Sequence, residues 1–264
     1  MFLPTTIKEV RARGWEQLDV ILFSGDAYID HPAFGAAVIG RLLEAEGYRV
    51  AIVPQPNWRD DLRDFTKLGT PRLFFGITAG SMDSMVNHYT ANIRLRSNDA
   101  YTPGGKAGFR PDYAVRVYTQ IVKRLFPHVP VVVGGIEASL RRLTHYDYWN
   151  DSLKPSVLAE SGADLLIYGM GERVVQQVAR ALRNGYNAKL LRKLRQVAFM
   201  AGKDYVERLD PAETIRLHSY EECARDNRAF GENFTVIETQ SNLMEPTATL
   251  VEAVGDRYVV VTPP

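Results

Sequence analysis

The sequence predicts an α/β protein built on a mainly parallel sheet of about five strands. Short β-branched apolar runs alternate with longer segments whose apolar residues recur at helical spacing. A strand, a helix and a second strand in succession form a βαβ unit, which makes the two strands parallel. In addition, polar loops that contain glycine follow three of the apolar runs. Ligands bind at the carboxyl ends of strands in such sheets, so these loops are expected to form one binding face.

The first βαβ unit follows a mixed, polar entry segment at residues 1–17. Apolar residues of its helix fall at i, i+4, i+8 and i+11 from Phe34, and Gly47 follows as a left-handed terminator. The expected elements are a strand at 20–23, a helix at 33–46, a strand at 50–53, a polar helix at 57–67 and a strand at 73–77.

Residues 79–111 interrupt the alternation of strands and helices because they hold few aliphatic residues and many polar ones. An irregular insertion of this length in a compact domain is unusual and often functional. The alternation of strands and helices then resumes. The expected elements are a helix at 113–126, a strand at 129–133, a helix at 136–143, a strand at 165–168 and a helix at 172–182.

A smaller carboxy-terminal extension is expected after the α/β domain, which gives domains at 1–187 and 188–264. Residues 196–200 read as a strand, and Ser219 with Glu222 forms a capping box that opens a long helix at 219–239. Residues 247–253 and 257–262 flank a turn and read as a β-hairpin. The final two prolines are expected to begin a linker to a further domain.

Composition narrows the class of protein. Hydrophobic residues make up 45% and charged residues 24% of the 264-residue chain, as in an ordinary soluble protein. A net charge of +1 argues against strong nonspecific attraction to nucleic acid or an anionic membrane. No transmembrane run and no signal-peptide pattern occur, so we expect a cytoplasmic protein that does not bind membranes. The one cysteine, Cys223, allows no internal disulfide and cannot alone hold a zinc or iron–sulfur site.

The loop after the first strand, residues 24–32, contains Asp26, Asp30 and His31. Carboxylate and imidazole groups together are normal ligands of a divalent metal, so these residues could bind one. The alternative is structural: Asp30 caps a helix that begins at Pro32, and Asp26 orders the turn. Both interpretations remain open at this stage.

The other strand-end loops carry glycines. Gly134 and Gly135 allow a ligand to approach the backbone closely, or allow tight packing of strand and helix. Glu137 lies near the next helix N-terminus, where it could serve the helix dipole alone. The run 169–172 lacks the third glycine of a dinucleotide loop. The candidate cofactor-binding residues are Gly25, Asp26, Asp30, His31, Gly80, Ser81, Gly134, Gly135, Glu137, Gly169, Gly171 and Glu172.

A basic and aromatic cluster, Arg141–Arg142 with residues 145–149, has two interpretations. Arginines and aromatic rings stack on bases, which would make a nucleic-acid contact. The rings could instead be partly buried, with their polar tips hydrogen-bonded. Lys106 and Arg110 are expected to be solvated charges.

Several long strings of residues resemble the amino-terminal part of the YgiQ-type radical-SAM proteins. The similarity runs from about residue 18 to residue 264. The strings are SGDAYIDHPAFG (24–35), SMDSMVNHYTAN (81–92), NDAYTPGG (98–105), GGIEASLRRLTHYDYW (134–149) and GMGE (169–172).

This resemblance implies a flavodoxin-like, cobalamin-binding-type domain in three layers, followed by a barrel downstream of this chain. The barrel would carry a C-x3-C-x2-C motif, hold a 4Fe-4S cluster and cleave S-adenosylmethionine. This chain has no cysteine triplet, so those sites lie outside it. Histidine-ligated cobalamin domains show D-x-H-x-x-G, whereas His31 directly follows Asp30 here. Cobalamin bound without that ligand, another ligand, or none remain open.

The leading functional hypothesis is an accessory amino-terminal module of a radical-SAM enzyme of unknown substrate. It would be non-catalytic alone and would place a cofactor or substrate over its own downstream barrel. Two alternatives come from other classes: a stand-alone divalent-metal hydrolase using Asp26, Asp30 and His31, and an RNA- or protein-binding module using Arg141–Trp149.

Overall fold

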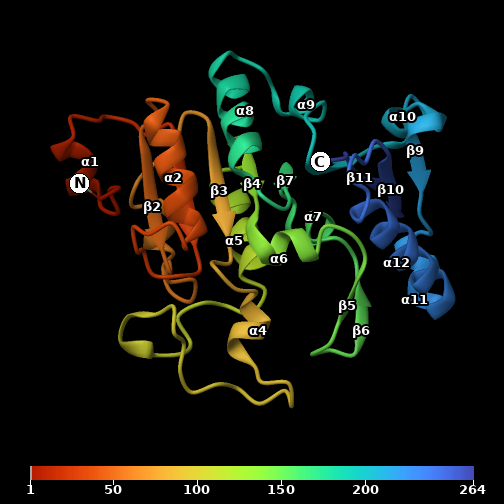
Figure 1. The fold of residues 1–264 in the computed structure, drawn as a ribbon. Coiled ribbons are helices and arrows are strands. Elements are labelled where there is room, and N and C mark those ends of the chain that lie inside the picture. The colour runs from red at the N-terminus through yellow and green to blue at the C-terminus, as the bar shows by residue number, and fades with distance from the viewer. Residues whose placement is uncertain (1) are drawn as a thin grey trace.

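The chain folds around one nine-stranded sheet with a separate small hairpin (Figure 1). The computed structural model describes residues 2–264, apart from the side chains of residues 188 and 189. The strands are β1 (Val20–Ser24), β2 (Val50–Pro54), β3 (Phe74–Thr78), β4 (Val131–Val133), β5 (His145–Asp147), β6 (Ser152–Lys154), β7 (Leu165–Ile167), β8 (Val197–Ala201), β9 (Thr214–Arg216), β10 (Thr249–Val254) and β11 (Arg257–Val261).

Helices connect these strands and cover the sheet. They are α1 (Ile7–Ala12), α2 (Gly35–Ala45), α3 (Arg63–Thr66), α4 (Ser84–His88), α5 (Ala114–Leu125), α6 (Gly135–Leu140), α7 (Val157–Ser161), α8 (Glu172–Arg183), α9 (Ala188–Leu191), α10 (Lys203–Val206), α11 (Tyr220–Arg225) and α12 (Asn227–Ser241). Short 3₁₀ turns, η1 (Pro103–Gly105) and η2 (Pro211–Glu213), complete the set. No helix in the described part of the chain is long and apolar enough to cross a bilayer.

The first half of the sheet confirms the predicted parallel α/β architecture. Five parallel strands lie in the order β2-β1-β3-β4-β7, which is the flavodoxin-like order. The strand order reverses between β1 and β3, so the topological switch point lies at their carboxyl ends.

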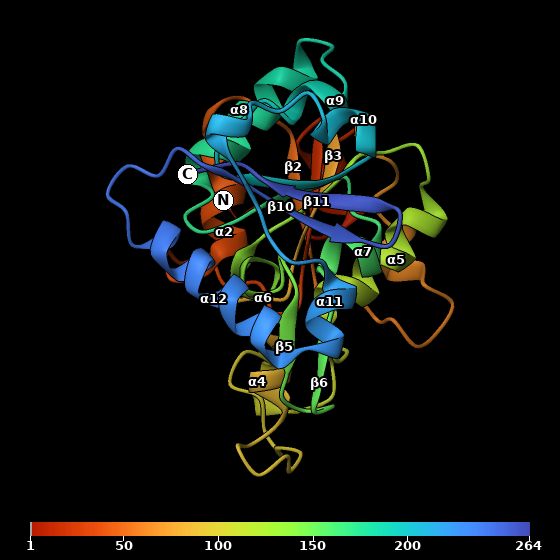
Figure 2. The ribbon, with the colours of Figure 1, turned by 90° about the vertical axis from the view of Figure 1, so that its right-hand side faces the viewer.

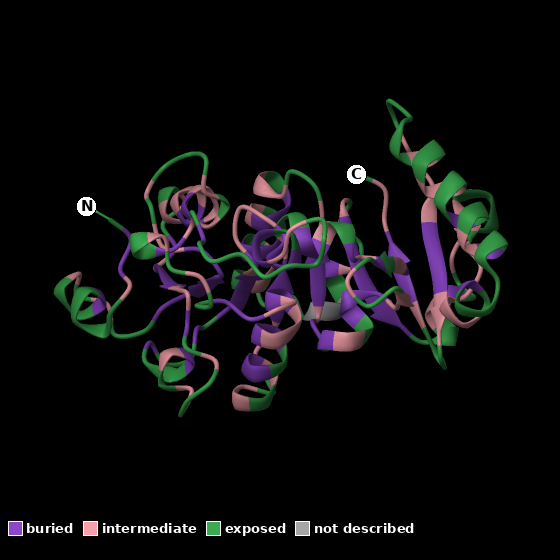
Figure 3. Cartoon of the chain, turned by 90° about the horizontal axis from the view of Figure 1, so that it is seen from below, coloured by how far each residue is buried: buried purple, intermediate pink, exposed green. Residues whose placement is uncertain are grey.

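The strands are buried on both faces, which makes three layers (Figure 3). On one face, α2 and α8 pack through residues such as Leu43 and Val178 against Leu22 and Phe74. On the other face, α3, α5 and α7 pack against the residues that alternate with these along the strands. Burial on both faces explains why the strands read as continuous apolar runs.

The carboxy-terminal extension continues the same sheet. β8 pairs antiparallel with β7, and β11, β10 and β9 follow outward. Figure 2 shows β10 and β11 side by side. The predicted strand and hairpin are confirmed, with α11 and α12 beside them. The predicted boundary between residues 187 and 188 therefore falls between β7 and β8, which are hydrogen-bonded neighbours.

Two predicted helices are wrong in extent. The polar helix expected at 57–67 is helical only over α3, because Asn57, Asp60 and Asp61 accept backbone N–H groups two residues ahead. The long helix expected at 219–239 is two helices. Asp226 has extended backbone angles, ends α11 and caps α12 through the Arg228 N–H.

The insertion at 79–111 lies against the carboxyl edge of the parallel strands (Figure 1). It contains α4 and η1, and two isolated β-bridges order its remaining loops. The hairpin β5–β6, which the sequence did not predict, lies at the same edge. Added structure is therefore concentrated where the α/β fold binds ligands.

Glu252 of β10 joins the extension to this edge. Its carboxylate accepts the Thr144 N–H at 2.8 Å, and the residue is 1% exposed. Burial raises the pKa of Glu252 to about 7. A carboxyl whose pKa is raised in the folded state stabilises the fold below its unfolded pKa, and this contribution is lost as the pH rises through about 7.

We predict that Glu252→Gln, which keeps an acceptor but cannot ionise, gains stability relative to the wild type as the pH rises. Between pH 5 and pH 8 the difference in unfolding free energy should shift by roughly 2 kcal/mol in favour of the variant. Urea unfolding at both pH values measures it. Glu245→Gln, which removes an exposed carboxylate, is the control and should show no such shift. An identical pH dependence for Glu252→Gln and wild type would contradict the prediction.

Candidate functional site

A largely apolar cleft of about 280 Å³ opens between the sheet and the N-terminal ends of α2 and α8. The carboxyl-terminal parts of β1, β3, β4 and β7 form its floor, so it spans the switch point. Ala36 and Ile39 of α2 form one wall, and Val175 of α8 forms the other. An apolar cleft with few polar groups is the usual form of a small-molecule site.

Glycines shape this cleft. Gly76 in β3 leaves the floor open, since a Cβ there would come 2.6 Å from Leu22 Cδ2. Gly135 has φ +83°, and a Cβ there would lie 2.5 Å from Thr78 Oγ1. A side chain at either position would collide with the sheet or fill the space that a ligand could occupy.

Five of the sequence-predicted residues line this cleft together. They are Gly134, Gly135, Gly169, Gly171 and Glu172. The first pair follows β4, and the remaining three follow β7. The apolar floor itself was missed by sequence reasoning because its residues also belong to the core. A glycine in the middle of a buried strand, Gly76, was the available signal.

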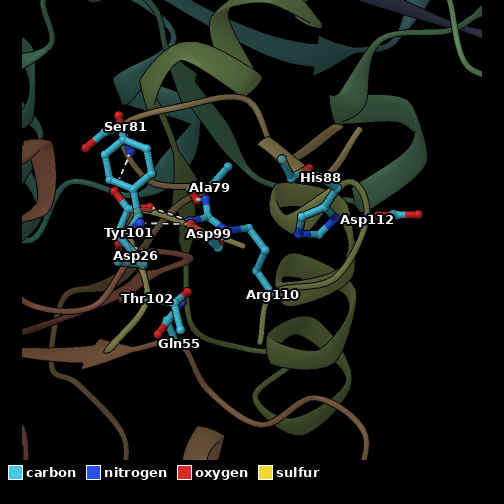
Figure 4. Close-up of polar contacts among 12 residues, drawn as sticks. Asp26, Gln55, Ala79, Ser81, His88, Asp99, Tyr101, Thr102, Arg110 and Asp112 are labelled. Atoms are coloured by element: carbon cyan, nitrogen blue, oxygen red, sulfur yellow. Dashed lines mark hydrogen bonds and ion pairs between the residues drawn. The ribbon is translucent and has the colours of Figure 1, made fainter. Parts of the chain in front are cut away.

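Asp26 and Ser81 lie outside the lining of this cleft, and Asp26 belongs to a buried ionic network (Figure 4). Asp26 Oδ2 accepts the Ser81 N–H at 2.6 Å, and Asp26 Oδ1 lies 3.0 Å from Arg110 Nη2. Burial raises the pKa of Asp26, while the Ser81 N–H and the Arg110 charge oppose that shift. Glycine is needed at positions 25 and 80. A Cβ on Gly25 would lie 2.1 Å from Ala79 O, and a Cβ on Gly80 would lie 2.1 Å from Asp26 Oδ1.

The prediction that Arg110 is a solvated charge is wrong, because the residue is only 1% exposed. Its guanidinium pairs with Asp26 and Asp99, donates to Ala79 O at 3.0 Å and lies 5.9 Å from the centre of the Tyr101 ring. A cation is stable in this position only because two carboxylates and a carbonyl surround it. The network therefore fixes the insertion to the strand ends.

Glu137 does more than stabilise a helix dipole, because it also accepts hydrogen bonds from two other helices. It is 1% exposed, and its two oxygens accept the N–H groups of Ser84 at 2.8 Å and Val115 at 2.9 Å. Burial raises the pKa of Glu137, and these hydrogen bonds oppose the shift. Glu137 joins its own helix α6 to α4 and α5 and lies outside the lining of the apolar cleft.

Asp30 and His31 form hydrogen bonds with other residues of this chain and do not line the apolar cleft. Asp30 forms a bidentate ion pair with Arg41, and its pKa is lowered by that hydrogen bonding. His31 is exposed, and its Nδ1 accepts the Ala33 N–H at 3.1 Å. The expected Asp30 cap is wrong, because α2 begins after Phe34 without a side-chain cap. Across residues 2–264, no three His, Cys, Asp or Glu side chains that the structure describes form a group able to hold a metal.

The basic and aromatic cluster is mainly structural. Arg141 is 7% exposed and forms an ion pair with Asp83, and burial lowers its pKa to about 10. Arg142 lies over the Tyr168 ring at 5.0 Å and donates to Ser139 O. Tyr146 and Tyr148 remain half exposed, but the two arginines are committed to internal contacts.

The last residues of the chain lie beside the cleft. Gln196 Nε2 donates to the carbonyls of Tyr168 and Met170, and its backbone N–H donates to Pro263 O at 2.7 Å. Tyr168 OH donates to Thr262 O at 2.5 Å. The loop that carries Gly169 and Gly171 is thus bound to the end of β11.

We predict that Arg110→Met lowers the unfolding free energy by about 3 kcal/mol or more, because it leaves two carboxylates buried without a cation. Arg110→Lys keeps the charge but cannot bridge both carboxylates, so its unfolding free energy should lie between those of the wild type and Arg110→Met. Chemical denaturation measures both. Arg63→Met, which removes an exposed ion pair with Asp61, should cost less than about 1 kcal/mol. Equal effects at Arg110 and Arg63 would contradict this account.

Comparisons with known proteins identify the family. The model described as "Radical SAM N-terminal" matches residues 2–264. UPF0313 proteins of Porphyromonas gingivalis and Bacteroides thetaiotaomicron are 62% and 56% identical over all of this chain. One from Thermotoga maritima is 47% identical. The chain spans 41%, 44% and 45% of these three relatives.

Among solved structures, the radical S-adenosylmethionine methyltransferase TsrM from Kitasatospora setae is similar over 68% of this chain and 28% of that chain. The TM-score is 0.45 and the sequence identity 20%. From the family model and the relatives, this chain belongs to the radical SAM N-terminal family and corresponds to the amino-terminal part of the longer UPF0313 proteins.

Proposed function

We propose that this chain is the accessory amino-terminal domain of a cytoplasmic radical-SAM iron–sulfur enzyme. It would hold a cofactor or substrate in the apolar cleft at the carboxyl ends of β1, β3, β4 and β7. The observation that carries the proposal is the position of this cleft at the switch point of a flavodoxin-like sheet, enclosed by two glycine loops.

The direction of the last strand supports this arrangement. β8 runs antiparallel to β7, and β11 runs antiparallel to β8, so β11 is parallel to β7. Its end therefore lies beside the carboxyl end of β7 and the loop around Gly169 and Gly171. A barrel that follows Pro264 would begin next to the cleft, where it could receive what the cleft holds.

The groups implied by the family fit this chain unequally. A 4Fe-4S cluster does not fit, since the only cysteine is the buried Cys223, whose pKa burial raises to about 11. Histidine-ligated cobalamin does not fit either, because Asp30 pairs with Arg41 and His31 Nδ1 accepts a backbone N–H. The apolar cleft fits a non-polar ring or chain of a cofactor or substrate.

The first test is iron and acid-labile sulfide in the full-length gene product, purified without oxygen, beside residues 1–264 alone. We expect about four irons in the full-length protein and none in residues 1–264. A full-length product without iron, or a cluster held by residues 1–264, would refute the accessory-domain proposal.

The second test fills the cleft. Ala36→Phe places a ring where α2 lines the cleft, so it should displace any bound molecule. Native mass spectrometry of the anaerobically purified full-length protein should show a bound mass in the wild type and not in Ala36→Phe. Ala45→Phe, on an exposed position of the same helix, should keep the bound mass and the same iron content. A bound mass equal in both variants, or none in the wild type, would count against the cleft as the site.

A further inference from the structure

A second cleft, of about 410 Å³, lies at the same edge of the sheet but on the face covered by α5. The insertion forms one side of it, and the segment after β2 forms the other. Its chemistry-bearing lining is Trp58, Arg59, Asn87, His88, Arg96 and Asp112. This cleft is separate from the apolar cleft between α2 and α8, and its use does not depend on the proposed function.

A histidine oriented by a carboxylate lies at the base of this cleft. His88 is 7% exposed, and its Nδ1 lies 2.6 Å from Asp112 Oδ1. Tyr89 OH donates to the other oxygen of Asp112 at 2.9 Å. The pKa of Asp112 is lowered, mainly by the hydrogen bond from His88, so Asp112 is a carboxylate that accepts a hydrogen bond from the His88 Nδ1–H. Figure 4 shows the His88 ring between Asp112 and the Arg110 side chain.

Two buried side-chain nitrogen atoms, each in a residue that lines the cleft, lack partners among the described residues. They are His88 Nε2 and Asn87 Nδ2, and each residue is 7% exposed. Leaving such groups buried without a hydrogen bond costs free energy, so their presence in a cleft points to a ligand.

Two exposed arginines line the cleft, and neither forms an ion pair with a carboxylate in the described part of the chain. Arg59 lies over the Trp58 ring at 4.5 Å, and Arg96 Nε donates to Tyr89 O at 3.2 Å. The carboxylates of the cleft are already engaged, since Asp112 binds His88 and Tyr89, and Asp99 binds Arg110. The groups left for a ligand are therefore cations and nitrogen donors.

We propose that this cleft binds a small oxyanion, namely the phosphate or carboxylate group of an organic molecule. Arg59 and Arg96 would bind its charge at the opening, and the Asn87 amide and the His88 imidazole would donate from below. Asp112 would orient the His88 ring through Nδ1, and Nε2 would donate to the anion when it carries the ring's second proton. Guanidinium groups with fixed donors are the usual means of recognising phosphate and carboxylate.

Calorimetric titration of the full-length gene product with inorganic phosphate, and separately with succinate, tests the site at constant ionic strength. We expect saturable binding of at least one anion, and the tighter one identifies the chemical class. Arg96→Gln and His88→Gln should each weaken it by about tenfold or more, the value of one hydrogen bond to a charged group. Arg94→Gln, an exposed arginine of the same segment outside the cleft lining, should stay within about twofold.

Two results would overturn the proposal. One is the absence of binding heat for both anions up to about 10 mM, which excludes a useful affinity. The other is an equal loss in Arg94→Gln and Arg96→Gln, which would mean a general effect of positive charge. Circular dichroism of each variant checks folding, and the exposed position of Arg96 keeps the comparison valid if His88→Gln unfolds.

Discussion

The arrangement of loops at the carboxyl edge of the parallel strands depends on the buried guanidinium of Arg110. The insertion at 79–111 contains few aliphatic residues, so apolar burial alone cannot hold it against the sheet. Arg110 provides the alternative by pairing with Asp26 after β1 and with Asp99 in the insertion. Because an unpaired buried charge is very costly, the three groups hold one another in place. Glu137 acts in the same way through backbone N–H groups of Ser84 and Val115.

Arg110 and Glu137 hold the insertion in place, and the two faces of the sheet differ in chemistry at this edge. On the face of α2 and α8, the strand ends keep an apolar floor, and glycine loops open it. On the face of α5, the insertion brings His88, Asp112 and arginines together above the same edge. One parallel sheet therefore presents an apolar cleft on one face and an arginine-lined cleft on the other, and the buried charges that hold the insertion at this edge are paired.

Sequence periodicity was sufficient for the parallel sheet and for α2, α5 and α8, because those elements are stabilised by burial of one apolar face. It was not sufficient for Arg110, whose partner Asp26 is 84 positions away and invisible to a local pattern. Side-chain hydrogen bonds to nearby backbone overrode helix formation at 57–62. The glycine loops were found because their position after a strand has a physical meaning, whereas the cleft floor looked like ordinary core.

The four outer strands also determine where residues 262–264 lie. Had the chain stopped after α8, its last residue would lie at the far end of that helix from the cleft. β8 and β11 reverse direction twice and return the chain to the end of β7, where Gln196 joins Pro263 to the Met170 loop. A hydrogen-bonded sheet holds that exit point more rigidly than a flexible linker would. The extension therefore holds residue 263 beside the loop that borders the cleft.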